Sequence, residues 1–156
     1  MEKKQQELQE FMRSQALKDI VGTEAVNHYK RSFEDEGFTD ETLNPWKEVE
    51  RRNPESPWFG HSGQTGKFSL ERTSAPILSG ETGELKNAIR YTYLPDGVRV
   101  SNSAPYAAVH QYGLPAKIYG KKPFTMTPRP FIGRSKALKR NIEDKIKRQM
   151  LDIIKK

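Results

Sequence analysis

Hydrophobic residues recur with helical spacing near the C-terminal end of the chain. This apolar stripe consists of Leu138, Ile142, Ile146, Met150 and Ile153. Residues spaced in this way share one face of a helix, so the pattern predicts a long amphipathic C-terminal helix. Its basic residues lie toward the other face: Lys136, Lys139, Arg140, Lys147 and Arg148. Core packing is the default interpretation of the stripe, and a solvated or partner-facing surface is the default for the charges.

Two further helices are expected in the N-terminal part of the chain. The first has a narrow apolar stripe made of Leu8, Phe11, Met12, Ala16 and Ile20. Thr23 is suited to cap the second helix through its side-chain oxygen, and Gly37 is suited to end it. The second helix carries Val26, Tyr29 and Phe33 on one face. In the turn-rich stretch around Pro45, we expect three residues to fold back onto the core: Phe38, Leu43 and Trp46.

The middle of the chain alternates between hydrophobic and polar residues, a period of two that indicates a half-buried strand. The alternation begins at Ile89 and resumes at Val98 and Val100, on either side of the turn sequence Leu-Pro-Asp-Gly at residues 94–97. Proline presets its own φ and glycine tolerates positive φ, so the two segments predict a β-hairpin. A short helical pattern that opens at Thr82 comes just before it.

The segment at residues 53–75 is rich in Pro, Gly and Ser and has little periodicity. We expect a long loop that is flexible at residues 53–67 and contains one short strand near residues 68–70. Loops of this length in a compact domain are usually functional or disordered. The stretch GHSGQTGKF is similar to a phosphate-binding loop, but Phe68 stands where such a loop needs Ser or Thr. A flexible loop is therefore favoured over a nucleotide site.

Together these patterns predict an α+β fold. A small antiparallel sheet with a central β-hairpin is expected to pack against N-terminal helices and a long C-terminal helix. Because 156 residues normally form one domain, we expect residues 1–156 to be a single domain. Phe131 and Ile132 are expected to anchor the start of the terminal helix against the sheet.

Composition limits the classes of function. Only 34% of the residues are hydrophobic, which predicts a small core and favours an oligomer that shares buried surface between subunits. The chain has no cysteine, and it has no apolar run of the roughly 18–20 residues that span a bilayer. Its first residues are too polar for a signal peptide. We therefore expect a protein that stays in the cytoplasm where it is made.

The net charge of +7 is distributed unevenly. Residues 1–112 hold 14 basic and 17 acidic side chains, whereas residues 113–156 hold 13 basic and 3 acidic ones. Such a bias is typical of a surface that contacts nucleic acid, a membrane or an acidic protein partner. Aromatic residues do not interleave with the basic run as a base-stacking surface requires. A solvated or protein-docking surface is therefore favoured.

No set of residues points to catalysis, to a metal or to a cofactor. His28, His61 and His110 share no ligand spacing, and no serine lies in a Gly-x-Ser-x-Gly elbow. His110 is the sharpest candidate for chemistry because histidine titrates near neutral pH. A hydrogen-bonding structural role near a helix end is nevertheless favoured for it. We therefore expect no enzyme and no cofactor.

Three short motifs follow one another in the second half of the chain. The first contains Leu78, Thr82, Gly83 and Leu85, the second Tyr106, Ala107, His110, Gln111 and Gly113, and the third Arg129, Pro130, Phe131, Ile132 and Gly133. In this order, with the hairpin after the first motif, the chain resembles the bacteriophage virion morphogenesis family, the Mu-type tail completion proteins. The resemblance covers residues 20–155, with a looser fit at residues 45–75.

This resemblance implies a non-enzymatic structural protein of phage or prophage virion assembly, which completes or stabilises the tail at the head-tail junction. Its implied partners are other head-tail or tail proteins and further copies of itself, with a ring as one arrangement. The implied location is the virion, close to the DNA channel, and the host bacterial cytoplasm during assembly.

Two groups of residues are contact candidates for such partners. The family motifs supply the first group: Tyr106, His110, Gln111, Arg129, Pro130 and Phe131. The basic residues of the terminal helix form the second group, and they rest on charge alone. From the same charge, the alternative function is a small basic nucleic-acid-binding module.

Overall fold

The computed structural model describes residues 1–80, 82–117 and 123–156. The helices and strands, in chain order, are α1 (Glu2–Met12), α2 (Gln15–Asp35), β1 (Gly37–Thr39), β2 (Leu43–Pro45), α3 (Glu84–Asn87), β3 (Ile89–Leu94), β4 (Gly97–Asn102), α4 (Ala107–Tyr112), β5 (Pro115–Ala116), β6 (Phe124–Thr125) and α5 (Lys136–Lys155). Two short 3-10 turns, Glu50–Arg52 and Glu71–Thr73, lie between β2 and α3. The predicted α+β class is confirmed.

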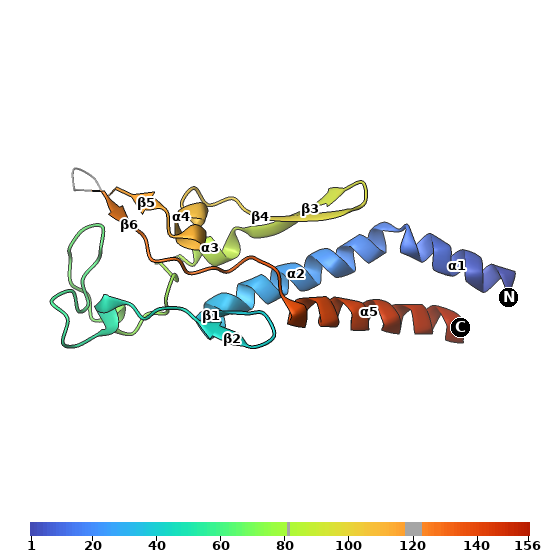
Figure 1. The fold of residues 1–156 in the computed structure, drawn as a ribbon, viewed down its shortest axis with the longest axis horizontal. Coiled ribbons are helices and arrows are strands. Elements are labelled where there is room, and N and C mark those ends of the chain that lie inside the picture. Colours follow the sequence, from blue (N-terminus) through green and yellow to red (C-terminus); the bar gives the residue numbers. More distant parts are fainter. Residues whose placement is uncertain (81, 118–122) are drawn as a thin grey trace.

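Helix α2 is the centre of the arrangement, with the β3–β4 hairpin packed on one side and α5 on the other (Figure 1). Helix α1 lies along the far part of α5, so both termini are at the same end of the molecule. The long segment between β2 and α3 lies at the opposite end. The described strands form three separate two-stranded antiparallel sheets, β1–β2, β3–β4 and β5–β6, in place of the one small sheet expected from the sequence.

The β3–β4 hairpin lies flush against α2 because Gly22 has no side chain. A Cβ atom on Gly22 would lie 2.4 Å from the ring of Tyr91. The hydroxyl groups of Tyr91 and Tyr93 both donate to Asp19 Oδ1, at 2.9 and 2.5 Å. The two strands pair along their full length up to the turn, which confirms the predicted hairpin.

Helix α2 begins earlier than predicted, whereas its end just before Gly37 agrees with the prediction and differs only in which residue takes the left-handed conformation. Ser14 caps it, with its Oγ accepting from the backbone N of Leu17 at 3.3 Å, whereas Thr23 lies within the helix. At the other end, Glu36 takes the left-handed conformation, with a φ of 51°. Gly37 is instead the first residue of β1, where a Cβ atom would lie 2.6 Å from a carbonyl oxygen of β2. The glycine therefore allows two strands to approach closely.

The core is small and rich in aromatic side chains. The ring of Phe33 lies 5.5 Å from that of Trp46 and 5.3 Å from that of Phe131. Phe131 is only 1% exposed, so its expected burial is confirmed, and its ring contacts Phe33 of α2. Leu43, which was expected in the core, is 44% exposed. The core consists of Ala25, Tyr29, Phe33, Phe38, Trp46, Ile77, Leu85, Ala88, Ile89, Ala104, Ala107, Phe131 and Leu138.

Helix α5 is only partly covered by the rest of the described chain. Of the predicted apolar stripe, Leu138 is buried and the other members are half-buried. The covering contacts come from α2 and α1. Lys145 of α5 forms an ion pair with Glu24 of α2, a residue that is only 7% exposed. The predicted amphipathic helix is therefore confirmed, but part of its apolar face remains accessible.

The predicted long loop at residues 53–75 is held by short turns. The strand expected near residues 68–70 is wrong, because this part of the loop makes only an isolated bridge between His61 and Phe68. The backbone N of Gly60 donates to the carbonyl of Arg51 at 2.8 Å, and the N of Ser69 donates to the carbonyl of Gly60 at 2.9 Å. These bonds fold the loop back on itself near its base.

Candidate functional site

Gln111 fastens α4 to the extended segment that leads into α5. Its Oε1 accepts from the backbone N of Phe131 at 2.9 Å and from that of Ile132 at 3.1 Å. Its Nε2 donates to the carbonyl oxygen of Ile132 at 2.5 Å. One side chain thus supplies three hydrogen bonds to a segment that belongs to no helix or strand, where backbone groups need other partners.

Arg129 and Pro130 continue this junction on the other side of the segment. The Arg129 guanidinium donates to the carbonyl oxygens of Lys47 at 3.0 Å and Glu48 at 3.3 Å. The Trp46 indole donates to the carbonyl oxygen of Pro130 at 2.7 Å. Burial lowers the pKa of Arg129, and the nearby Glu48 carboxylate partly opposes this effect. The guanidinium therefore acts as a buried clamp on two backbone oxygens.

His110 and Tyr106 lie at the same junction. The backbone N of Arg129 donates to the carbonyl oxygen of His110 at 2.8 Å, and the rings of His110 and Tyr106 meet edge to face at 5.9 Å. Tyr106 donates to Glu84 Oε2 at 2.5 Å; burial and then this carboxylate raise the pKa of Tyr106 to about 12. Burial, and then the Arg129 charge, lower the pKa of His110. Its Nδ1 is buried without a hydrogen-bond partner in the described parts of the chain.

The structure therefore brings the six motif residues together, and most of them point inward. Phe131 and Arg129 are buried, whereas the side chains of Tyr106 and Pro130 have exposed surface. We call this group the motif junction: Tyr106, His110, Gln111, Arg129, Pro130 and Phe131. Its hydrogen bonds give it a clear internal role, and its role as a partner contact stays a prediction.

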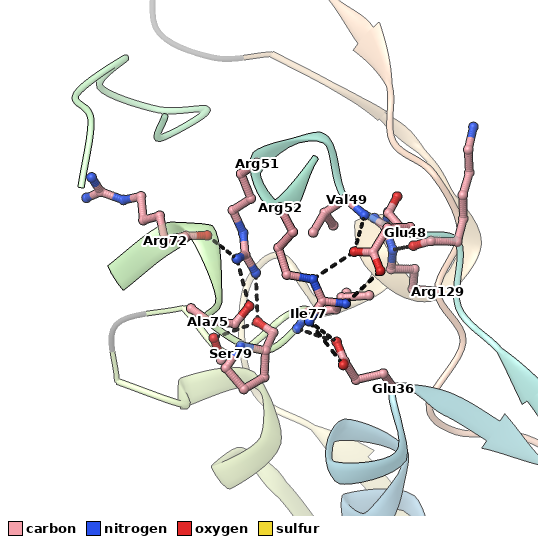
Figure 2. Close-up of polar contacts among 12 residues, drawn as sticks. Glu36, Glu48, Val49, Arg51, Arg52, Arg72, Ala75, Ile77, Ser79 and Arg129 are labelled. Atoms are coloured by element: carbon pink, nitrogen blue, oxygen red, sulfur yellow. Dashed lines mark hydrogen bonds and ion pairs between the residues drawn. The ribbon is translucent and has the colours of Figure 1, made fainter. Parts of the chain in front are cut away.

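A cluster of arginines beside the junction holds the long loop to the end of α2 (Figure 2). Arg52 pairs with Glu48 at 2.7 Å and with Glu36 at 2.9 Å, and these contacts raise its pKa. Glu36 also accepts from the backbone N of Ile77 at 2.8 Å. Glu36, at the end of α2, thus links Arg52 before the loop to Ile77 after it.

The side chain of Arg51 binds backbone carbonyl groups at the far end of the loop. Its guanidinium donates to the carbonyl oxygens of Arg72, Ala75 and Pro76, each at 2.7 Å (Figure 2). Sequence reasoning missed both arginines. The available signal was a pair of arginines at the start of a loop without regular structure, where backbone carbonyls need donors.

The basic residues of α5 are exposed and only partly paired. Lys136 lies 3.3 Å from Glu41, and Lys139 lies 3.9 Å from Glu143. The other cations of the predicted contact group, Arg140, Lys147 and Arg148, make no ion pair within the described residues. These side chains leave a positive surface that is available to a partner.

An open groove of about 940 Å³ runs beside the start of α5. Its apolar wall is formed by Tyr29 of α2 with Leu138 and Ile142 of α5. Charged residues also line it: Asp40, Arg134, Lys136, Lys139 and Glu143. We call this feature the α2–α5 groove.

Two properties of the described residues bear on other classes of function. No group of three or more His, Cys, Asp or Glu side chains there is placed to hold a metal ion. In the same residues, no helix is both long and apolar enough to cross a membrane.

Comparison with known proteins gives one match. The model of the phage virion morphogenesis family matches residues 41–151, which include the motif junction, the arginine cluster and most of α5. No curated protein and no solved structure matches the chain.

Proposed function

The chain belongs to the phage virion morphogenesis family, and from this membership we propose that it completes or stabilises the tail at the head-tail junction. Membership itself gives the protein a structural role in virion assembly, in contact with other virion proteins. The finer role rests on the motifs that the chain shares with tail completion proteins. In this proposal the protein is not an enzyme, and it assembles in the host cytoplasm before it becomes part of the virion.

The observation that carries the proposal is the family match over residues 41–151. The site geometry supports an assembly role, because the motif residues hold the fold together through hydrogen bonds to backbone groups. What remains exposed is a set of surfaces suited to contacts: the cations of α5, the α2–α5 groove and apolar side chains on the long loop.

We assign the cations of α5 to a contact with an acidic virion protein. The apolar stripe of α5 faces the body of the subunit, so the exposed cations point toward whatever lies outside it. The exposed aromatic side chains of a base-stacking surface do not accompany them on this helix. A protein neighbour therefore fits this surface better than single-stranded nucleic acid does.

Charge reversal tests this assignment. The variant changes Lys139, Arg140, Lys147 and Arg148 to Glu, and it should fold normally because exposed charges contribute little to stability. We expect it to fail to complement a phage that lacks the gene. A matched control reverses four exposed cations elsewhere: Lys3, Arg13, Lys47 and Arg99. Normal particle yield from the α5 variant would contradict the proposed contact.

The rival function is a nucleic-acid-binding module. A titration of the parent protein with duplex DNA across a range of salt concentrations distinguishes it from the protein contact. Binding driven by phosphate contacts weakens steeply as salt rises. Weak binding at all salt concentrations supports the protein contact. Tight, salt-sensitive binding that the α5 variant loses would favour the rival.

A further inference from the structure

Both outer edges of the β3–β4 hairpin are unpaired in the part of the chain that the structure describes. Next to the hairpin, the backbone N of Ser103 donates to the carbonyl oxygen of Ala88 at 3.3 Å, in continuation of the strand register. Antiparallel pairs alternate, so every second pair from there turns its backbone groups outward. The outward residues include Tyr91 and Tyr93 in β3 and Val98 and Val100 in β4. Their backbone groups make no hydrogen bond to another described residue.

Strand β3 lacks the features by which proteins keep an edge from pairing. An edge strand is a template for a further strand unless Pro, Lys, a bulge or a covering segment protects it. The sequence of β3, Ile-Arg-Tyr-Thr-Tyr-Leu, contains neither Pro nor Lys, and its register with β4 has no bulge. Its one charged side chain, Arg90, donates to Ser103 Oγ at 2.8 Å. The edge is therefore suited to add a strand.

Helix α2 carries an uncharged row of residues, which we call the α2 seam. The seam consists of Ala16, Ile20, Thr23 and Asn27, whose spacing of four, three and four is that of residues packed between two helices. Ile20 is half-buried, and the other three are exposed. In a chain with 30% charged residues, an exposed helix face without charge is suited to packing against another helix.

Polar contacts place β3 on the side of α2 that carries this seam. The hydroxyl groups of Tyr91 and Tyr93 reach Asp19, and Lys86, just before β3, pairs with Glu34 at 3.0 Å. Asp19 is four residues before Thr23 of the seam, and Glu34 is eleven residues after it, so all three share one side of the helix. The free edge of β3 and the α2 seam therefore belong to the same side of the molecule.

The seam and the edge of β3 also share one centre. The midpoint of the seam lies next to Gly22, where a Cβ atom would lie 2.4 Å from the ring of Tyr91. One antiparallel register matches the outward groups of Tyr91 to those of Tyr93 in a second copy, and it places Thr92 opposite Thr92. Aromatic pairs and threonine pairs are favourable across neighbouring strands. A two-fold axis beside Thr92 thus also passes close to the middle of the seam.

The spacing of the two layers agrees with such an axis. Neighbouring strands lie about 4.8 Å apart, so two hairpins joined edge to edge have their midlines about 10 Å apart. Because α2 packs on both strands of its hairpin, the two α2 helices would have a similar separation, which is close to the 8–10 Å of packed helices. The axis makes these helices antiparallel and brings Ile20 opposite Thr23 of the second copy.

We propose that two copies of this chain pair about a two-fold axis through their β3 edges and their α2 seams. The result is a four-stranded sheet that lies on two helices. This inference goes beyond the proposed function, which names other virion proteins as partners. A stable interface takes about 800 Å² per partner, so the contact needs both layers, the strand edge and the helix seam.

Sedimentation of the parent protein up to about 100 µM, a range suited to weak transient contacts, measures the association. Thr92→Glu places two carboxylates opposite each other in the dimer, while within one copy the new side chain lies across from Arg99. Because like charges directly opposite are destabilising, we expect at least about tenfold weaker association. Ser101→Glu, which lies across from Arg90 on the other strand, is the matched control and should associate like the parent.

A disulfide tests the register independently of stability. The chain has no cysteine, so Thr92→Cys introduces its only thiol. Residues in such a pair have Cα atoms about 4.5 Å apart, within the range of about 4.4–6.8 Å for a disulfide. With oxidised glutathione as the oxidant, Thr92→Cys should form a covalent dimer at least about tenfold faster than Ser101→Cys. Adding Thr23→Lys, which puts a charge into the α2 seam, should slow this reaction.

Several outcomes overturn the inference. A parent that sediments as a monomer throughout would do so, as would a Thr92→Cys variant that crosslinks no faster than Ser101→Cys. Larger assemblies that Thr92→Glu and Ser101→Glu weaken equally would indicate pairing of β3 with β4 of the next copy and also contradict it. A parent that dimerises as described but is dispensable for particles would support this inference and overturn the proposed function alone.

Discussion

The motif junction and the long loop use aromatic side chains in opposite ways. At the junction, Phe131 is 1% exposed and its backbone N is held by Gln111. On the loop, Trp58 and Phe68 are more than half exposed, although backbone hydrogen bonds such as that from Ser62 N to the carbonyl oxygen of Lys67 connect its turns. This difference in exposure indicates that the two regions have different roles. The residues that resemble a functional motif build the subunit, whereas a segment without a recognisable motif presents the apolar surface.

The largest expected difference in stability comes from removing one aromatic ring from the motif junction and, in a separate variant, one from the long loop. Phe131→Ala should lower the free energy of unfolding by about 3–5 kcal/mol, because the cavity lies inside the core beside Phe33. Urea unfolding measures this value. Phe68→Ala, on the loop, is the control and should leave the midpoint nearly unchanged. Equal effects from both substitutions would remove the distinction between the two regions.

Hydrogen bonds at the junction should give the next largest effect. Gln111→Ala leaves the backbone groups of Phe131 and Ile132 without partners and should cost about 1–3 kcal/mol. Gln111→Glu keeps the acceptor and loses the donor, so it should cost less than the alanine variant. Gln64→Ala, an exposed loop substitution, is the control. A Gln111→Ala melting curve that overlays the parent's would show that water replaces these bonds freely.

The stability of the junction should depend on pH through His110. Its pKa is lowered from the ordinary value of 6.5 by burial and by Arg129. As the pH falls below that value, the unfolded chain binds a proton that the folded chain resists. The free energy of unfolding should therefore decrease as the pH falls from about 7 to about 5. His110→Gln should flatten this slope, and His61→Gln on the loop should not; identical slopes would rule out His110 as the cause.

The loop should also open more easily than the junction. We expect limited proteolysis of the monomer to cut first at residues 53–67, since loops exposed to solvent open at low free-energy cost. Mass spectrometry of the first fragments identifies the site. If the β3–β4 hairpin is cut before the loop, the expected order of local stability is wrong.

The smallest effect is expected from Trp58→Ala. Its side chain is 60% exposed, so the free energy of unfolding should change by less than about 0.5 kcal/mol. Thermal unfolding of the monomeric protein measures this change. A loss of more than about 2 kcal/mol would place Trp58 among the residues that stabilise the fold.

The sequence predicted the elements whose pattern is local. The β3–β4 hairpin and the amphipathic helix α5 are confirmed because periodicity and turn residues encode them directly. The residues at which helices begin were harder to predict from the sequence. Thr23 has the right chemistry for a cap, but α2 begins earlier, at Ser14, where the chain turns sharply out of α1.

The candidate site was only partly predictable for a different reason. The six residues of the motif junction were identified from the sequence, but their mutual contacts depend on segments that meet only in the folded chain. The roles of Arg51 and Arg52 were missed because their partners are mostly backbone carbonyls and distant carboxylates, which leave no sequence pattern. Sequence motifs show which residues belong together, and only the structure shows which of them face inward.

The hydrogen bond from Trp46 to Pro130 joins residues 84 positions apart and bears on how the protein is made. During translation, the N-terminal helices leave the ribosome long before the segment that closes their core. A nascent chain that stops before Phe131 leaves Phe33 and Trp46 uncovered, which marks it for host chaperones and proteases. We therefore expect truncated products to be cleared before they reach a growing particle.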